Sequence, residues 1–472
     1  MSRDPSPTLT DKRGMGGIIA QDGFEYQIWD ALARLPEWLR DAAFEGLIVE
    51  GIEDVEARFL APHANSGRVV DRFQAKSGTL SASDVEAVCE AFAQFDRFYP
   101  GHARRHVLVT PALPRGLEWM ARDSRRVKNA RPFYAPFRAV LKASDEKLAK
   151  DFADQLGETL GPAVAASVDF DLRPTMDRRV AEALFASEWN SAFPEVDLSG
   201  RQVGELFASF SALLQERRGR LVHRHELLDL ADKAAGREVL TRRILPIVVR
   251  SAEGGDSSRM IEIDGTPFSD FSSGVPRESV WRENLLTPMR RLESVAHRNF
   301  DRVRLAGSFR ISTALCIGSI FRAVRGYEID LETRDGIWST DERVGDVDAT
   351  PPWQVTEPSR PAGPRLTVVI GVLRDPLPDV LRHGQVSAAH QALHLQLNQA
   401  VENAVHIQSS VRLVKDAVAR AVAKGGVSGI DLFFAGPASL AVALGHRWNG
   451  MPSTQLHEFR PGDGYAPSAI LD

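Results

Sequence analysis

The chain contains little cysteine and no apolar run long enough to cross a bilayer. Its 472 residues include two cysteines, Cys89 and Cys316, which are too few for a disulfide scaffold or a four-cysteine zinc site. We interpret both as core residues, because an unpaired cysteine behaves as a small apolar side chain. The first residues, MSRDPSPTLTDKRG, lack the apolar segment of a secretory signal. We therefore expect a cytoplasmic protein without a membrane partner.

The chain also lacks the overall positive charge of a protein coated for nucleic-acid binding, since its net charge is −5. The charge is unevenly distributed, however. From Arg104 to Lys142, ten Arg and Lys residues stand against Glu118 and Asp123, so this segment is +8 and the remainder is −13. A local positive field of this kind attracts a phosphate backbone. A solvated helix face paired with acidic neighbours would give the same composition.

What the chain does contain is the composition of a folded protein, with 43% apolar and 26% charged residues. A chain of this length predicts more than one domain, each with a core of ordinary size. Up to about residue 110 the patterns predict a helix, strands beside an acidic residue, a strand with a lysine, a helix and the apolar strand HVLVT, which is an α/β unit. Helical patterns dominate residues 143–243 and indicate a helical extension or a connector.

An acidic residue beside one predicted strand is followed by a polar-x-Lys sequence on the next. The residues are Asp54, in EGIEDVEARF, and Gln74 and Lys76, in RVVDRFQAKSG. Metal-assisted cleavage of a phosphodiester needs a carboxylate, commonly a second metal ligand, and a group that stabilises charge or moves a proton. Asp54 and Gln74 could hold Mg²⁺, while the ammonium of Lys76 could orient the attacking water and offset charge on the phosphate. The alternative interpretation is two edge strands with charged outer faces.

Gln74 occupies a place that a carboxylate holds more often in such sites. A neutral ligand gives the site less negative charge and a weaker affinity for Mg²⁺ than two carboxylates would. Strand alternation puts Glu56 on the same face as Asp54 and Glu53 on the other face, so Glu56 could assist. Three further side chains could complete the metal site: Glu50, Glu25 and Gln27.

Three stretches of this region resemble, in order and spacing, the nuclease domain of the PD-(D/E)xK superfamily found in bacterial antiphage effectors. They are GGIIAQDGFEYQ, VEGIEDVEARF and DRFQAKSGTLSASDV. In that family a helix motif G-F-x-Y-Q precedes an acidic residue and a Q-x-K strand. The resemblance implies that Asp54 and Gln74 are metal-site residues, that Lys76 is the catalytic lysine and that Gln27 is the contribution of the helix. It covers about the first 110 residues and offers no counterpart for Glu25.

The C-terminal part contains a faint internal repeat. Residues 302–321, RVRLAGSFRISTALCIGSIF, and 429–448, GIDLFFAGPASLAVALGHRW, each run from an apolar strand through Ala-Gly into a helix. A glycine turn where a strand meets a helix N-terminus is the usual geometry for receiving a phosphate or a nucleotide. The pattern predicts two similar α/β halves with a ligand-facing turn in each. Ordinary turns of a parallel sheet would produce the same pattern.

The same part resembles a SAVED domain, a sensor of cyclic oligonucleotides built from two fused CARF-like halves. The matching stretches within 245–472 are GSFRISTALCIGSIF, YEIDLETRDGIWST and FFAGPASLAVALGHRWNGMPSTQLHEF. The resemblance gives Trp338 a role in stacking on a base, an interaction worth about 1–3 kcal/mol per base. The alternative is that Trp338 is a partly buried aromatic side chain of the core. The other candidate ligand residues are Ser308, Arg310 and Ser312 at the first turn, and Gly436, Pro437 and Ser439 at the second.

The two turns depart from strict symmetry. Pro437 stands where the first turn carries Ser308, and proline removes a backbone donor. The second turn also carries no cationic side chain to match Arg310. We therefore expect the ligand to be held asymmetrically.

Together the resemblances imply an α/β chain in three parts. These are a restriction-endonuclease-like nuclease domain at 1–145, a helical extension or connector at 146–245, and a SAVED domain of two CARF-like, Rossmann-like halves at 246–472.

The function that this organisation implies is that of an antiphage effector of the CBASS type. A partner nucleotidyltransferase makes a cyclic di- or trinucleotide, the SAVED domain binds it, and self-association brings nuclease domains together to cut double-stranded DNA with Mg²⁺. Such coupling requires the ligand to bind the associated state better than the free one. One alternative is a catalytically inactive nucleotide-sensing scaffold or DNA-binding protein, for which Gln74 is the best argument. Another is a restriction-like enzyme that needs no second messenger.

Overall fold

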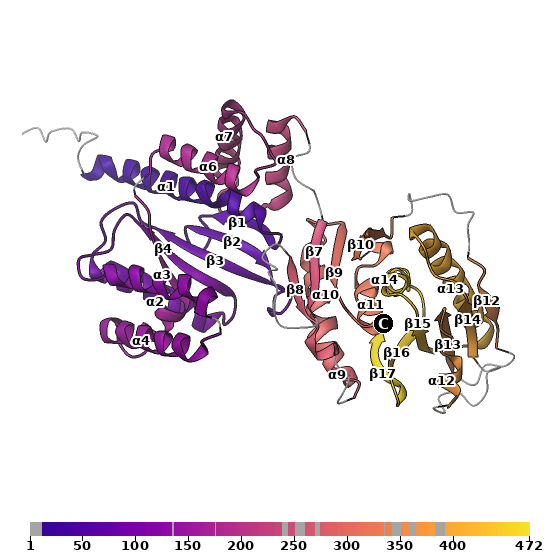
Figure 1. Cartoon of the computed structure of the whole chain (residues 1–472). Helices are drawn as coiled ribbons and strands as arrows, with labels where there is room; N and C mark the ends of the chain where they lie inside the picture. The colour runs from indigo at the N-terminus through magenta and orange to yellow at the C-terminus, as the bar shows by residue number, and fades with distance from the viewer. Residues whose placement is uncertain are drawn as a thin grey trace, which may run out of the picture. The chain divides into compact units, whose positions relative to one another are not determined.

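The chain folds into two compact units, Met1–Arg242 and Arg243–Asp472 (Figure 1). The computed structural model describes residues 12–134, 136–174, 176–237, 244–250, 260–269, 274–334, 336–341, 351–358, 364–382 and 392–472. The mixed α/β fold predicted from the sequence is confirmed in both units. The finer division at residues 145 and 245 stays a prediction. No helix in the described ranges combines the length and the apolar character that crossing a membrane requires.

The first unit is built on a six-stranded sheet with the order β5-β4-β3-β2-β1-β6. Its strands are β1 (Phe44–Val49), β2 (Val55–Leu60), β3 (Arg68–Ala75), β4 (Ala103–Thr110), β5 (Val168–Leu172) and β6 (Val222–His223). The pairs β1–β2 and β2–β3 are antiparallel, whereas β3–β4 and β4–β5 are parallel. The two edge strands, β5 and β6, come from the stretch in which the sequence shows mainly helical patterns, because both strands are too short to give a clear alternation.

Helices cover both faces of this sheet (Figure 1). One face carries α1 (Lys12–Arg40), α6 (Arg178–Ala192), α7 (Gly200–Glu216) and α8 (Arg224–Ala235), and the other carries α2 (Ala82–Phe98), α3 (Glu118–Tyr134), α4 (Arg138–Leu156) and α5 (Leu160–Ser167). Side chains alternate between the two faces of a strand. Phe73 and Val107 therefore lie in the hydrophobic core on the α1 side of the sheet, and Leu108 lies in the core on the α2 side. The sheet is therefore buried on both sides, and functional side chains are confined to strand ends and edges.

The second unit contains two sheets, with the orders β11-β10-β9-β7-β8 and β12-β14-β13-β15-β16-β17. The strands of the first are β7 (Ile244–Arg250), β8 (Ile261–Asp264), β9 (Arg302–Gly307), β10 (Glu328–Thr333) and β11 (Gly336–Ser339). Those of the second are β12 (Gln354–Thr356), β13 (Arg365–Val372), β14 (Ala392–Leu397), β15 (Gly429–Ala435), β16 (Ser453–Arg460) and β17 (Gly464–Leu471). Parallel strands form the centre of each sheet, which confirms the two predicted Rossmann-like halves.

The helices of the second unit connect and separate these sheets. They are η1 (Thr266–Phe268), α9 (Glu278–Trp281), η2 (Arg282–Leu286), α10 (Thr287–Ala296), α11 (Ile311–Ile320), η3 (Ala323–Arg325), α12 (Leu377–Arg382), α13 (Ala404–Gly425) and α14 (Ala438–His446). The repeated sequence corresponds to β9–α11 in the first half and β15–α14 in the second. Helices α11 and α14 pack directly against each other (Figure 1).

Two glycines explain how closely α11 and α14 approach. A Cβ atom on Gly318 would lie 2.1 Å from the carbonyl oxygen of Val442, and one on Gly445 would lie 2.2 Å from that of Leu315. No side chain tolerates such contacts with backbone, so each helix needs a glycine where it meets the other. These two glycines, one in the helix of each repeated segment, therefore serve helix packing at the centre of the unit.

Candidate active site and ligand-binding cavity

Asp54 and the Gln74-x-Lys76 sequence lie together in the first unit. Strands β2 and β3 pair with Val55 opposite Phe73, which brings the start of β2 beside the end of β3. Oδ2 of Asp54 accepts hydrogen bonds from the backbone nitrogen of Ala75 at 2.7 Å and from Nε2 of Gln74 at 2.6 Å. Antiparallel pairing thus turns a separation of twenty residues in sequence into direct contact.

The environment of Asp54 raises the pKa of its carboxyl group. Burial is the largest cause, while the hydrogen bond from Ala75 and the charge of Lys76 act in the opposite direction without overcoming it. The negative charge of Glu50 raises the pKa further. A partly buried carboxylate whose charged form is disfavoured in this way gains from a nearby cation.

Mg²⁺, which the nuclease resemblance implies, finds a modest set of donors here. No three carboxylate, histidine or cysteine side chains within the described residues converge as a metal-binding group. The hydrogen bonds of Asp54 to its described neighbours use Oδ2 and leave Oδ1 for a metal ion. With the amide oxygen of Gln74, the carbonyl oxygen of Ala75 and water, this set fits Mg²⁺, which often takes only one or two carboxylates and keeps several waters.

The neighbouring glutamates have structural partners. A carboxylate oxygen of Glu56 accepts from the backbone nitrogen of Ile52 at 3.0 Å. Glu53 pairs with Arg72, and Glu50 pairs with Arg218. These bonds hold the loop before β2, so the three glutamates position Asp54 in the described structure.

Helix α1 brings Gln27 into the same unit, as the resemblance requires. The Oε1 atom of Gln27 is buried and finds no hydrogen-bond partner in the part of the chain that the structure describes. Nearby, the guanidinium of Arg218 lies over the ring of Phe24 at 4.3 Å and also contacts Glu50. Glu50 in turn donates its backbone nitrogen to the carbonyl of Asp54 at 2.7 Å. Arg218 therefore connects this part of α1 to the loop that carries Asp54, although Gln27 itself makes none of the hydrogen bonds to Asp54.

The second unit contains a cavity of about 720 Å³ whose walls come from both halves. Four of the predicted ligand residues line it: Ser308, Trp338, Pro437 and Ser439. Ser308 follows β9 in the first half, whereas Pro437 and Ser439 begin α14 in the second. One ligand in this cavity would therefore touch both turns that the sequence repeat singled out.

A second cavity, of about 520 Å³, adjoins the first and shares Ser308 and Phe309 with it. It lies at the carboxyl ends of β7 and β9, where the strand order reverses, which is the usual ligand position in an open α/β sheet. Arg310 lines this cavity and donates a hydrogen bond to the carbonyl oxygen of Ser269 at 3.1 Å.

The structure does not place Ser312 or Gly436 on the walls of either cavity. Ser312 is 1% exposed. Its backbone nitrogen donates to Glu458 at 2.9 Å, and its hydroxyl lies 2.8 Å from that of Ser468. A ligand could reach Ser312 only by displacing Glu458. A Cβ atom on Gly436 would lie 3.0 Å from the ring of Phe434, so this glycine accommodates packing behind the turn.

Sequence reasoning missed part of the larger cavity's wall. Glu332, Thr333 and Arg334, at the end of β10, line it together with Val401. Arg334 is the cationic side chain that the second turn lacks. A polar run directly after an apolar parallel strand was the available signal, because strand ends carry ligand contacts in this class of fold.

Comparison with known proteins identifies the second unit. Residues 288–471 match the family model described as "SMODS-associated and fused to various effectors sensor domain", abbreviated SAVED. The CD-NTase-associated protein 4 of Moraxella osloensis is 24% identical over 476 residues, covering 99% of this chain and 100% of the relative. The protein of the same name from an Acinetobacter species is 23% identical, with 99% and 100% covered.

Solved structures show the same fold. The Acinetobacter baumannii Cap4 SAVED/CARF-domain containing receptor with 3'3'3'-cAAA matches with a TM-score of 0.76 and 21% identity, over 95% of this chain and 99% of that one. Its complex with 2'3'3'-cAAA gives 0.77 and 21%, over 95% and 98%. The Moraxella osloensis receptor gives 0.71 and 20%, over 96% and 100%.

The fold and the cavities thus define a chain whose second unit contains a SAVED sensor domain. Along its whole length the chain is similar to CD-NTase-associated protein 4, so the resemblance to CBASS effectors with a SAVED domain is confirmed, whereas the nuclease assignment of the first unit stays a prediction. Strands β7 and β8 lie before residue 288 and complete the first sheet of this unit.

Proposed function

We propose that this chain is a CBASS effector that cuts double-stranded DNA with Mg²⁺ when a cyclic oligonucleotide occupies its SAVED domain. The observation that carries the proposal is the contact of Asp54 with Gln74 and Ala75, directly before Lys76. A partly buried carboxylate with a raised pKa, an amide and an ammonium at one strand end form the minimum set for metal-assisted hydrolysis. The similarity to CD-NTase-associated protein 4 supports the effector role.

A cyclic trinucleotide is the activator that we propose, in the two adjoining cavities of the second unit. The Acinetobacter baumannii receptor was solved with 3'3'3'-cAAA and with 2'3'3'-cAAA. Trp338 would stack on a base, and the hydroxyls of Ser308 and Ser439 would donate to phosphate or sugar. Arg310 supplies positive charge to the smaller cavity and Arg334 to the larger one. We infer that a partner nucleotidyltransferase makes this ligand.

In the first unit, Asp54 and Gln74 would hold Mg²⁺ together with the carbonyl oxygen of Ala75. The bound ion would supply Lewis-acid chemistry and lower the pKa of a bound water. The carboxamide of Gln74 now donates to Asp54, so it must turn its oxygen toward the ion and give up that hydrogen bond. Lys76 offsets negative charge on the phosphate and orients the water, and its backbone nitrogen is fixed by a hydrogen bond to Val109 at 2.8 Å.

Ligand binding must be coupled to cutting through a difference in affinity. We propose that self-association is the coupling step, which requires the ligand to bind the associated state more tightly than the free chain. The chain would act in the cytoplasm, where it can meet both the nucleotide and foreign DNA. Analytical ultracentrifugation with and without the cyclic trinucleotide tests this step, and an unchanged sedimentation coefficient would exclude it.

Replacing Lys76 by Ala should abolish DNA cutting and leave ligand affinity unchanged. Loss of a preorganised charge at a developing oxyanion typically lowers the rate by about 10²–10³-fold. Plasmid is incubated with Mg²⁺ or EDTA across a panel of cyclic di- and trinucleotides, and ligand binding is titrated in parallel. Lys233→Ala, which removes an exposed lysine of α8 that lines none of the described cavities, serves as the control that should still cut. Undiminished cutting by the Lys76→Ala variant would remove this residue from the active site.

A second candidate function is a nucleotide-sensing scaffold that binds DNA or a protein without cutting. The observation in its favour is that no group of three carboxylate, histidine or cysteine ligands is found among the described residues, and that Gln74 stands in a carboxylate's place. The same assay separates the candidates, since a scaffold binds the ligand and never nicks the plasmid. A restriction-like enzyme would instead cut without any cyclic nucleotide.

A further inference from the structure

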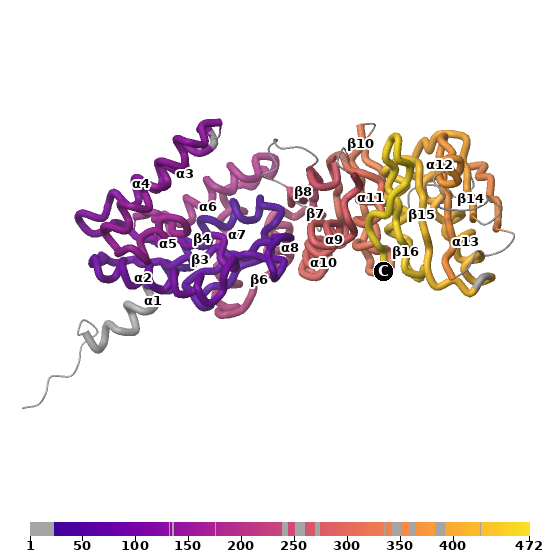
Figure 2. Tube along the Cα trace, turned by 90° about the horizontal axis from the view of Figure 1, so that it is seen from below, coloured from indigo at the N-terminus to yellow at the C-terminus, as the bar shows by residue number. Residues whose placement is uncertain are grey.

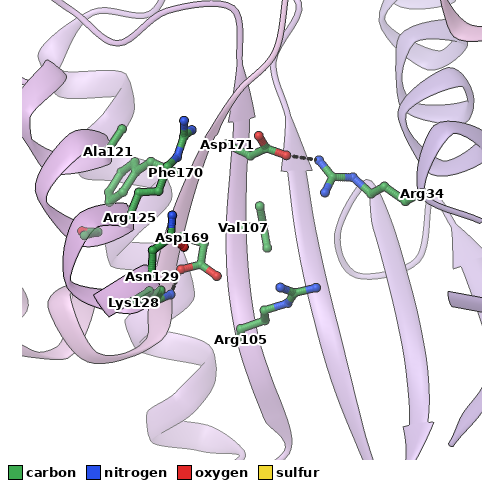
Figure 3. Close-up of a pocket in the computed structure, with 11 residues that line it drawn as sticks. Arg34, Arg105, Val107, Ala121, Arg125, Lys128, Asn129, Asp169, Phe170 and Asp171 are labelled. Carbon is green, nitrogen blue, oxygen red and sulfur yellow. Dashed lines mark hydrogen bonds and ion pairs between the residues drawn. The ribbon is translucent and has the colours of Figure 1, made fainter. Parts of the chain in front are cut away.

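A separate cavity of the first unit lies at the β5 edge of the sheet, between α1, α3, β4 and β5 (Figure 3). Its volume is about 190 Å³. Cationic side chains reach it from three of these elements: Arg34 of α1, Arg105 of β4, and Arg125 and Lys128 of α3. Asp54, Gln74 and Lys76 are not among its lining residues. This cavity is therefore distinct from the candidate active site.

Three of the four cations are held in place by carboxylates. Arg34 donates to Asp30 at 2.8 Å and to Asp171 at 2.6 Å. Figure 3 shows its guanidinium directed at Asp171 across the cavity. Arg105 donates to Asp71, and Lys128 pairs with Asp169. These bonds hold the three cations in place and offset their charge, and two of the carboxylates, Asp169 and Asp171, line the cavity themselves.

Arg125 differs from the other three cations. It is exposed, and no ion pair joins it to any residue in the described ranges. Its neighbours along α3 include Arg122, which pairs with Asp123, and Arg131, which pairs with Asp145. Arg125 is thus the cation of the cavity that is available to a ligand.

Ser124 supplies an independent sign that a ligand belongs here. Its side chain lines the cavity and is 4% exposed, and its hydroxyl finds no hydrogen-bond partner among the described residues. Buried hydroxyl groups are almost always hydrogen-bonded. For a phosphate oxygen in the cavity to accept this hydrogen, the hydroxyl, which is covered in the described structure, must turn toward the guanidinium of Arg125.

The surface beyond the cavity favours a polymer over a small anion. From residue 125 to 142 the chain has six Arg and Lys and no Asp or Glu. The C-terminal end of α3 points away from the sheet (Figure 2), and exposed aromatic side chains lie there, with Phe133 79% exposed beside Tyr134 and Phe137. Positive charge with interleaved aromatic rings suits a nucleic-acid strand, which offers phosphates to the cations and bases or sugars to the rings.

We propose that this cavity binds one backbone phosphate of a nucleic acid, with Arg125 and Ser124 in contact with it and α3 following the strand. The proposal deepens the proposed function and rests on it for the identity of the substrate. The phosphate held here is not the one that is cleaved, because Lys76 is absent from the walls. Its role is to anchor the DNA on the first unit at a second point.

The test compares two neighbouring arginines. Arg125→Glu alters the cavity, whereas Arg126→Glu makes the same charge change on the same helix at an exposed residue that does not line the cavity. Both are made in the full-length Lys76→Ala chain, and binding of labelled duplex DNA is measured in EDTA by fluorescence anisotropy. We expect Arg125→Glu to weaken binding about tenfold and to reduce the salt slope by about one, and Arg126→Glu to weaken it less than about threefold. Ser124→Ala should weaken binding about two- to fivefold.

Equal losses in the two glutamate variants would overturn the proposal, because they would reflect only general surface charge. In two further arms of the experiment, inorganic phosphate or a mononucleotide is added, and the change in the melting temperature of the protein is measured by thermal shift. Stabilisation by these small anions that depends on Arg125, with unchanged DNA binding, would also overturn it in favour of a small-anion site. Cutting by the Lys76→Ala chain in Mg²⁺ would refute the active site and leave this binding comparison intact, so the two failures are distinguishable.

Discussion

At the scale of single residues, the loop before β2 is organised around one carboxylate. Asp54 receives two hydrogen bonds from the end of β3, and Glu50 supports it from the other side. Glu50 has a φ of 56°, a left-handed conformation that costs a non-glycine residue about 1–2 kcal/mol. Its side chain pairs with Arg218, and its backbone nitrogen binds the carbonyl of Asp54. Strain held by such contacts next to a buried carboxylate is typical of functional sites.

The raised pKa of Asp54 predicts an acid limit to DNA cutting above the range of an ordinary aspartate. A metal ligand must be ionised, so activity falls as the pH drops through the pKa of this group. Burial raises that pKa above the usual 3.8, and Glu50 adds to the shift. The pH dependence of the cutting rate should show this limit, and Glu50→Gln should move it to lower pH because one negative charge is removed.

The profile is measured at saturating activator and at Mg²⁺ concentrations well below saturation, where the rate reports ionisation of the metal-free protein, because a bound cation would itself lower the pKa of its ligand. Far-UV circular dichroism confirms that the protein stays folded. A limit at or below pH 3.8, or one that Glu50→Gln leaves in place, would contradict the role of Asp54.

At the scale of elements, α11 and α14 pack directly against each other at the centre of the second unit. Gly318 and Gly445 allow it. At the N-terminus of α11, Glu458 of β16 accepts a hydrogen bond from the backbone nitrogen of Ser312. Burial raises the pKa of the Glu458 carboxyl group, and the hydrogen bonds from Ser312 offset part of this rise. A carboxylate at a helix N-terminus is stabilising because it accepts unpaired N–H groups and meets the positive end of the helix dipole. The contact thus fixes the two halves, and with them the cavity between their turns.

Gly445→Ala should destabilise the second unit by about 1–3 kcal/mol, the usual effect of overpacking a dense core. The added Cβ would lie 2.2 Å from the carbonyl oxygen of Leu315, so α11 and α14 would have to separate. Gly23→Ala is the matched control, because that helical glycine has nothing within 4 Å of an added Cβ, and alanine there should be stabilising by up to about 1 kcal/mol. Differential scanning calorimetry measures both, and an unchanged second-unit transition in Gly445→Ala would refute the packing argument.

At the scale of the whole molecule, each unit has its own sheets and its own candidate site. The DNA-cutting residues that we propose belong to the first unit, and the ligand cavities belong to the second. Ligand binding in the second unit can therefore affect cutting by the first unit only through a change in the state of the whole chain. Because such coupling is a difference in binding free energy, weaker ligand binding should shift the activator concentration that is needed without changing the maximal rate.

Trp338→Ala should raise the concentration of cyclic trinucleotide required for DNA cutting by about 5–150-fold, which corresponds to the loss of about 1–3 kcal/mol of base stacking. Saturating ligand should restore full cutting. Ile337→Ala is the control, since Ile337 is the preceding, exposed residue of β11 and does not line the cavity. Ligand affinity is measured by calorimetric titration and cutting by plasmid nicking. Unchanged affinity in Trp338→Ala would remove this residue from the ligand site.

Much of the fold was predictable because its signals are local. The apolar strand HVLVT, the spacing of apolar residues in α1, and the Ser81 cap of α2 each depend on a few neighbouring residues. Strand β5, VDFDL, was not predicted, since five alternating residues among helices carry too little periodicity. Ser308 and Ser312, which were both predicted as ligand residues of one turn, show the same limit of prediction from local sequence. Both are serines near a helix N-terminus, yet Ser308 lines the cavities and Ser312 is buried against Glu458 and Ser468.

The sequence by itself determined the α/β class, the two similar halves of the second unit, and the meeting of Asp54 with Gln74, because two consecutive antiparallel strands bring the start of the first beside the end of the second. Only the tertiary structure decided which side chains share a cavity. Arg334 and Pro437 come from different halves, and Arg34 and Arg125 come from helices on opposite faces of one sheet. Contacts of this kind depend on sheet order and helix packing, which arise from interactions between residues far apart in the chain and leave no periodic pattern in it.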